Sequence, residues 1–264
     1  MIFNLTGGGG IRKPQFSYTG DYLESAYQGT DGVSYKLYTL TSSGVLTAKM
    51  KNADIWLCGG GSSGAPNDTS GTMPSSRGGA GAYCASAMQQ TLSGNYTVTI
   101  GAGNGGTTSV GELLSAAGVT SAGNGGTGGG NGGTGDGQSK YPFGDTAQFQ
   151  CHCAGGGGGA RANNGPNYWT TYNGGTGGTN GGNGGNISLN SSETFQSTAS
   201  GGAGGNYGGG KGGNVSGTTV NAGASATFYG SGGGLGAYSS SNFQTYNGGA
   251  GAGYQGVCYI RVPA

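Results

Sequence analysis

The feature that most constrains this chain is a glycine-rich stretch that encloses a short aromatic segment. Residues 155–185 read GGGGGARANNGPNYWTTYNGGTGGTNGGNGG, and in the second half glycine recurs every third residue, at Gly175, Gly178, Gly181 and Gly184. A three-residue period fits neither an α-helix nor a β-strand, but it fits polyproline II geometry, a left-handed helix with three residues per turn. That helix has no internal hydrogen bonds, so its N–H and C=O groups point outward and need partners when they are buried.

Glycine lets such helices pack against one another, because a Cβ atom would block the close approach of two backbones. The sequence therefore predicts a bundle of polyglycine-II helices that bond laterally to each other. Glycine rods of this kind recur through residues 123–253, separated by polar and aromatic segments. In such a bundle the large side chains are confined to these segments, the tips that join one rod to the next.

Composition and charge exclude several classes of protein. Collagen is excluded because the chain has only six prolines and glycine does not hold every third position throughout. Charged residues make up 7% of the chain, against a typical ~25%. The net charge of +1 gives no electrostatic case for binding nucleic acid or an anionic membrane. No apolar run reaches the roughly 18–20 residues that a membrane span needs, so we expect no membrane insertion.

Conventional strands are expected near both ends of the chain, and almost no α-helix is expected anywhere. The β-branched, alternating or continuously apolar runs are Val33–Leu40, Val45–Met50, Ala53–Cys58, Ala82–Met88, Asn95–Ile100 and Gly256–Val262. We therefore predict a jelly-roll-like β-sandwich framework from residues 33–122 and 254–264, with the polyglycine-II bundle inserted at about 123–253. The last strand is expected to pair back with the early ones.

Residues 1–32 differ from the rest in carrying a sizeable share of the chain's charge. We interpret them as an attachment segment, with a disordered tail as the alternative. The opening MIFNLTGGGG lacks the basic region and apolar core of a signal peptide. We therefore expect the protein to be made in the cytoplasm and to leave the cell as part of an assembled particle.

The five cysteines and the single histidine offer little chemistry. An odd number of cysteines without repeated spacing makes a poor disulfide framework. Cys151-His152-Cys153 raises the alternative of a metal site, but no CxxC and no second histidine would complete it. Buried structural thiols are favoured. Calcium at Gly132–Asp136 is a weaker alternative, and no catalytic motif is present, so we expect no enzyme and no cofactor.

The tips are better suited to binding. They combine aromatic side chains with Ser, Asn, Thr and Gly, the composition of antibody paratopes, and aromatic faces beside amides and hydroxyls also suit sugars. The alternative is that the aromatics only cap the ends of the rods. The candidate receptor-binding residues are Tyr168, Trp169, Tyr172, Phe195, Tyr207, Phe228, Tyr229, Tyr238, Phe243 and Tyr246.

Three segments carry a resemblance to a known group of proteins: ADIWLCGGGSSG, RGGAGAYCASAMQQTLSGNYTVTIGAGNGGTTSVG and GGAGAGYQGVCYIRV. Together they resemble the glycine-rich domain of phage and prophage tail proteins, over roughly residues 40–264. The rods and tips are similar to the polyglycine-II adhesin at the fibre tip of T-even-like phages, and also to the glycine-rich region of certain animal receptor kinases. The chain lacks kinase and transmembrane parts, so the phage resemblance is preferred.

The resemblance implies a receptor-binding adhesin in the tail of a virion. Its partners would be a host surface glycan or an outer-surface protein, and other tail proteins would bind through residues 1–32. A homotrimer is one open assembly state. The main alternative is a structural, self-assembling tail or filament component without receptor binding. An ice-binding protein is a third hypothesis, but Thr176 and Thr179 are too few for a wide threonine array.

Overall fold

The computed structural model describes residues 15–64, 78–120, 140–157, 209–213, 221–236 and 248–264, and the backbone of the short strands β8 to β14. Within these residues the protein is almost entirely β-strand and extended backbone, without an α-helix and with one 3₁₀ turn, η2 (Pro142–Gly144). None of them forms a helix long and apolar enough to cross a membrane.

The larger sheet has eight strands and is antiparallel. Its order is β2-β3-β15-β4-β5-β6-β7, and β1 pairs with the first half of β4. The strands are β1 (Gln15–Tyr18), β2 (Tyr22–Gln28), β3 (Ser34–Leu40), β4 (Gly44–Cys58), β5 (Cys84–Thr99), β6 (Thr108–Val110), β7 (Leu114–Ala116) and β15 (Val257–Pro263).

The last strand pairs with the early ones, as expected, because β15 lies between β3 and β4. The expected strands Val45–Met50 and Ala53–Cys58 are two halves of β4, and Ala82–Met88 and Asn95–Ile100 fall largely within the single strand β5. β1 and β2 lie within the predicted attachment segment 1–32 and pair with strands of the predicted framework.

The sheet bends at β4 and β5 and closes around a first core. The β4–β5 pairing shifts register between Met50 and Ala53 and again before Ile55. Asn52 and Gln89 adopt positive φ angles of 55° and 54° at this point. Such a bulge bends a strand, and here both halves of β4 contribute side chains to one cluster. The first core includes Leu40, Leu46, Met50, Ile55, Leu57, Leu92, Val98 and Ile260.

The expectation of a mostly β structure without α-helix is therefore confirmed for the described residues, and the eight strands of this region belong to one bonded sheet. β1, which branches from β4, packs against β3 at the first core, where Phe16 stacks on Tyr38 with ring centroids 3.8 Å apart. A second core lies on the other face of the second half of β4. It is formed by Leu37, Trp56, Cys58, Ala82, Cys84, Cys153, Val257 and Tyr259.

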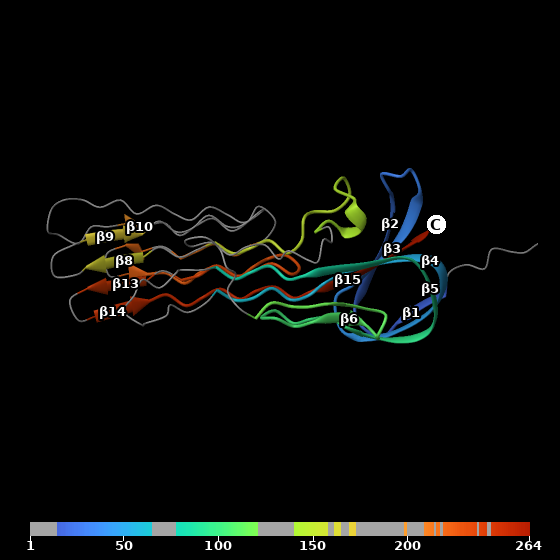
Figure 1. The fold of residues 1–264 in the computed structure, drawn as a ribbon, viewed down its shortest axis with the longest axis horizontal. Coiled ribbons are helices and arrows are strands. Elements are labelled where there is room, and N and C mark those ends of the chain that lie inside the picture. The colour runs from blue at the N-terminus through green and yellow to red at the C-terminus, as the bar shows by residue number, and fades with distance from the viewer. Residues whose placement is uncertain are drawn as a thin grey trace, which may run out of the picture.

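Glycine segments leave this sheet and run side by side away from it (Figure 1). The central one is residues 231–236. The backbone nitrogen of Gly233 donates to the carbonyl oxygen of Ser62 at 3.0 Å, and its carbonyl oxygen accepts from Gly79 at 2.7 Å. Lateral bonds of this kind join the central segment to residues 61–64, 78–80, 154–157, 209–213, 223–226 and 248–253.

The surrounding segments also bond to one another and form a closed ring. The bonds around the ring are Ser62 N to Ala80 O, Gly156 N to Gly79 O, Gly157 N to Gly210 O, Ala224 N to Lys211 O, Ala226 N to Ala252 O and Gly64 N to Gly251 O. Every segment of the ring therefore bonds to the centre and to both of its neighbours. We call the central segment and its ring the glycine array.

The close approach of these backbones explains why the segments are glycine. A Cβ atom on Gly233 would lie 2.0 Å from the carbonyl oxygen of Gly251, and one on Gly156 would lie 2.0 Å from that of Gly233. No side chain fits at such distances. Gly249, by contrast, has nothing within 4 Å of its Cβ position.

Short strands lie at the end of the array away from the larger sheet (Figure 1). A four-stranded sheet has the order β14-β13-β8-β9, and a three-stranded sheet has the order β10-β11-β12. The strands are β8 (Arg161–Asn164), β9 (Trp169–Tyr172), β10 (Thr198–Ala199), β11 (Val215–Ser216), β12 (Thr219–Val220), β13 (Tyr238–Ser241) and β14 (Gln244–Asn247).

Candidate functional site

The four-stranded sheet brings together four of the predicted binding residues. Trp169 and Tyr172 lie on β9, Tyr238 on β13 and Tyr246 on β14. Trp169 and Tyr246 are separated by 77 residues in sequence, so only the return of the glycine segments to the same end places them on one sheet. We call this sheet the tip sheet.

The strand pairing of the tip sheet places a positively charged residue, Arg161, beside two of these aromatic residues. Arg161 of β8 is the cross-strand partner of Tyr172 on one side and of Tyr238 on the other. Asn247 continues the same row as the partner of Tyr238. Arg161 is also the one charged residue in the four strands of the tip sheet. Sequence reasoning missed it because the pairing of β8 with both β9 and β13 is not visible in the sequence.

Phe228 and Tyr229, two further predicted residues, are not part of the tip sheet. Both are half-buried, and they pack on His152 with ring centroids 4.8 and 6.2 Å away. Tyr229 also contacts Tyr254 and packs against the second core. They therefore lie at the larger sheet, at the other end of the array. Tyr168, Phe195, Tyr207 and Phe243 lie outside the described residues.

His152 is enclosed by rings and hydrogen-bonded on both nitrogens. Its Nδ1 donates to the carbonyl oxygen of Gln150 at 2.9 Å, so that Nε2 accepts from the hydroxyl of Tyr259 at 3.0 Å. The Trp56 ring lies 4.9 Å from it, edge-on. Burial lowers the pKa of His152 to about 4, which the bond to Gln150 only partly opposes. The imidazole is neutral at pH 7 and acts as a polar member of the second core.

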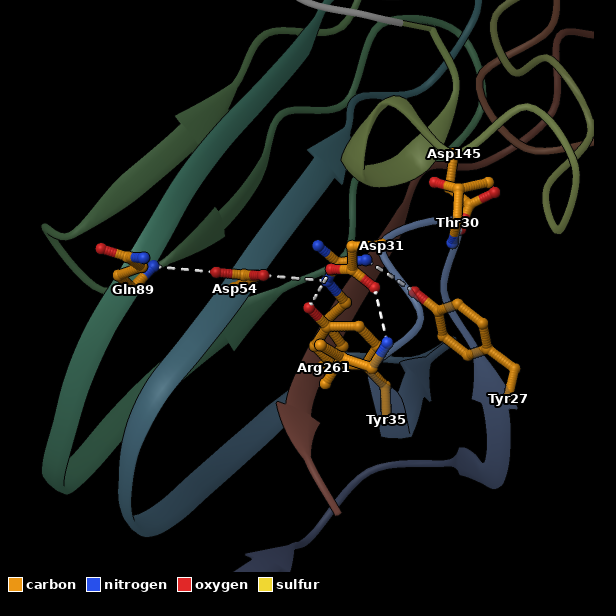
Figure 2. A network of polar contacts seen from close by, with 9 residues as sticks. Tyr27, Thr30, Asp31, Tyr35, Asp54, Gln89, Asp145 and Arg261 are labelled. Carbon is orange, nitrogen blue, oxygen red and sulfur yellow. Dashed lines mark hydrogen bonds and ion pairs between the residues drawn. The ribbon is translucent and has the colours of Figure 1, made fainter.

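A buried ion pair ties several strands together beside this core (Figure 2). Arg261 on β15 donates from Nε to Oδ2 of Asp54 on β4 at 2.8 Å, and both side chains are 8% exposed. The other carboxylate oxygen accepts from the backbone N–H of Gln89 at 2.8 Å. Arg261 also donates from Nη1 to the hydroxyl of Tyr27 on β2 at 2.9 Å. Each charge is therefore paired and bonded, as a buried ion requires.

Aromatic rings cover the guanidinium group. Its central carbon lies 4.1 Å from the ring centroid of Tyr35 and 4.4 Å from that of Phe143. The Tyr35 hydroxyl donates to Asp31 at 2.6 Å, and this bond is the main cause that raises the pKa of Tyr35 to about 12. The cluster holds β2, β3, β4, β5 and β15 in register.

The cysteines are all buried and reduced, which confirms the expectation of buried thiols. Three of them, Cys58, Cys84 and Cys153, meet in the second core. Cys151 and His152 do not lie on a strand, and Cys153 has a positive φ of 58°. Across the part of the chain that the structure describes, no group of three or more His, Cys, Asp and Glu side chains could hold a metal ion. The calcium alternative at Gly132–Asp136 lies outside that part.

A cavity of about 510 Å³ opens between the start of β5 and β7. Its walls are Tyr83, Cys84, Ala85, Ser86, Leu114, Ser115, Ala116 and Ala117. These are small or apolar side chains apart from the hydroxyl groups and the thiol. No charged residue lines the cavity.

Comparison of the chain with models of protein families, with curated proteins and with solved structures found no match.

Proposed function

We propose that this chain is a receptor-binding protein of a phage tail fibre or tail tip, carried on the virion. The observation that carries the proposal is the position of the tip sheet. It stands at the end of the glycine array away from the larger sheet, and it collects Trp169, Tyr172, Tyr238 and Tyr246 (Figure 1). A position at the far end of an elongated support suits a surface that must reach a host cell.

The support, we infer, is a bundle of polyglycine-II helices. The lateral bonds of the glycine array favour this geometry, because that helix bonds only to its neighbours. The closed ring around residues 231–236 and the lack of room for a Cβ atom on Gly233 favour it as well. On this proposal the bent sheet is the jelly-roll-like base from which the bundle projects.

The ligand we propose is a glycan or an outer-surface protein of a bacterial host. Aromatic side chains provide rigid contact area with a polar handle. The row Tyr172–Arg161–Tyr238 adds a guanidinium group, which binds carboxylate and phosphate groups through paired hydrogen bonds. This set favours an acidic surface sugar. The proposed role requires binding alone, with neither a cofactor nor a catalytic step, and with neither nucleic acid nor membrane as a partner.

Attachment to other tail proteins is proposed for residues 1–32. β2 lies within that segment and is the outermost strand of the sheet order. Its Leu23 is 67% exposed and Tyr22 is 39% exposed. An open edge with exposed apolar residues is a template for pairing with another chain. The same edge favours the second candidate function, a structural tail component that assembles through β2, and it would also serve a homotrimer.

The test is binding of the purified chain to a panel of bacterial surfaces and their extracted glycans. Three proteins are compared: the natural sequence, the double variant Trp169→Ala/Tyr172→Ala, and Tyr22→Ala as a control on the larger sheet. We expect strain-selective binding that the double variant loses and the control keeps. Circular dichroism and thermal melting establish that all three are folded.

Two other results would decide against the proposal. Equal binding by all three proteins would remove the tip sheet from recognition. Binding to no surface, together with loss of self-assembly or of tail assembly in Tyr22→Ala, would favour the structural candidate.

A further inference from the structure

Three thiols meet where the glycine segments leave the larger sheet. Cys58 ends β4, and its cross-strand partner Cys84 begins β5. Cys153 directly precedes the glycine segment 154–157, and its Sγ lies 3.4 Å from the Sγ of Cys84. Gly230 packs against the same group, since a Cβ atom there would lie 2.6 Å from the Cys153 sulfur and 3.1 Å from the Cys58 sulfur.

One of the three cysteines borders a cavity. Cys84 is one wall of the cavity between β5 and β7, whereas Cys58 and Cys153 do not line it. The neighbouring walls Ala85, Ala116 and Ala117 are small, so a molecule with two or three heavy atoms on each side of a disulfide fits within about 510 Å³. Cys84 is therefore the one of the three cysteines that borders the cavity, although its side chain is buried in the second core, where its Sγ contacts the Sγ of Cys153.

We propose that Cys84 and Cys153 form a thiol–disulfide exchange site that takes a small-molecule disulfide and closes a Cys84–Cys153 bond. The Cys84 thiolate attacks one sulfur of the reagent RSSR, which forms a mixed disulfide and releases RS⁻. The Cys153 thiolate then attacks the Cys84 sulfur and displaces the second RS⁻. Both thiol protons pass to the two RS⁻ groups, so that one RSSR is reduced to two RSH while the two cysteines are oxidised to one disulfide.

The bond would fasten the array to the sheet. It would join the start of β5 to the segment 154–157, closing a loop between residues 69 positions apart. A disulfide that closes a loop of this length stabilises the folded state more than one that closes a short loop, because it restricts the unfolded chain more. The contact with Cys153 and burial raise the pKa of Cys84 well above the ordinary value, and burial and the contact with Cys58 do the same for the pKa of Cys153. The exchange is therefore slow at neutral pH and faster in alkaline solution.

The experiment uses the folded full-length chain, reduced and then incubated with 2-hydroxyethyl disulfide at pH 8.5. Remaining thiols are alkylated, and a digest without reductant is mapped by mass spectrometry. We expect the chain to lose two of its five thiols, with the cross-link between the Cys84 and Cys153 peptides. Two molecules of 2-mercaptoethanol should be released per chain. The oxidised chain should melt roughly 5 °C or more above the reduced one.

Matched variants locate the reaction. Cys84→Ser and Cys153→Ser should both lose the cross-link, whereas Cys258→Ser, which removes a thiol of the first core, should keep it. Should Cys84→Ser fail to fold, mapping of the natural chain still decides the matter. A stable mixed disulfide on Cys84, a cross-link that involves Cys58 in place of Cys84, or five alkylated thiols after prolonged incubation would each overturn the proposal.

Discussion

In the larger sheet, backbone hydrogen bonds run between neighbouring strands, and side chains fill the two cores on its faces. In the glycine array, backbone bonds run outward from residues 231–236 in every direction, and at central glycines such as Gly233 the backbones approach too closely for a side chain. Both regions satisfy buried polar groups, as folded chains must. We therefore expect the larger sheet to lose stability when a buried side-chain group is removed. We expect the glycine array to lose stability when a side-chain atom is added.

The largest expected effect is that of one added methyl group in the centre of the array. Gly233→Ala places a Cβ atom 2.0 Å from the carbonyl oxygen of Gly251. Because backbone surrounds this segment on all sides, the clash cannot relax locally. We expect a loss of unfolding free energy at or above the ~5 kcal/mol that is exceptional for one substitution.

The control is the same substitution at an open position of the array. Gly249→Ala has nothing within 4 Å of the new carbon. It should change the unfolding free energy by less than about 1 kcal/mol. Urea denaturation of the two variants makes the comparison, and equal stabilities would contradict the close packing of the centre.

In the sheet, the corresponding damage comes from removing a group. Arg261→Met keeps an unbranched, largely apolar stem but removes the guanidinium group and leaves Asp54 as a buried charge without its partner. We expect a loss of about 3–5 kcal/mol, as for other broken buried pairs. The exposed pair Lys36–Glu24, with an N–O distance of 2.7 Å, is the control. Glu24→Gln should cost less than about 1 kcal/mol, and similar losses in both variants would mean that burial of the Arg261 pair does not matter.

Parts of this contrast could be predicted from the sequence. The continuous apolar runs ADIWLC and GVCYIRV predict buried strands, and both are central strands of the sheet. A single Asp in one run and a single Arg in the other were a signal for the Asp54–Arg261 pair, because isolated buried charges need partners. The bend was hidden, because asparagine at position 52 tolerates a positive φ angle without requiring one, and glutamine at position 89 gives no sign of one.

The array and the tip sheet show where such prediction ends. Glycine content and its three-residue period indicate lateral packing of backbones. They do not say which segment lies at the centre, because glycine runs have no side chains that distinguish one neighbour from another. The pairing of Arg161 with both Tyr172 and Tyr238 depends on that order of segments. Phe228 and Tyr229 shared the composition of the tips, yet they pack beside His152.

A smaller effect on the unfolding free energy is expected from the titration of His152, which lies beside the second core and not the first. Burial lowers the pKa of His152 to about 4, whereas an unfolded histidine titrates near 6.5. The unfolded chain therefore binds this proton first. The stabilisation by the neutral ring is complete above pH 6.5 and is lost as the pH falls towards 4, with a cost of about 2 kcal/mol between pH 7 and pH 5.

The variant His152→Phe isolates this titration. It removes the ionisable group from the second core while keeping a ring, and the first core is untouched. The natural chain should lose stability between pH 7 and pH 5 more steeply than the variant, as measured by urea denaturation at each pH. Parallel pH profiles would mean that His152 is not buried in its neutral form.

The smallest expected effect on stability is that of Arg161→Met, the same substitution as in Arg261→Met but at the other end of the molecule. Arg161 lies in the tip sheet, away from both cores of the larger sheet (Figure 1). We expect the unfolding free energy to change by less than about 0.5 kcal/mol, as for substitutions outside buried networks.

Binding of the Arg161→Met variant to an acidic host glycan should weaken about tenfold, since a hydrogen bond to a charged group contributes roughly 1.5–3 kcal/mol. Isothermal titration with acidic and neutral glycans makes the measurement, and Arg161→Lys separates charge from geometry: a paired contact requires the guanidinium fork, so lysine should recover only part of the affinity. Full recovery by lysine would reduce the role of Arg161 to its charge, and unchanged binding by Arg161→Met would leave recognition to the aromatic residues of the tip sheet.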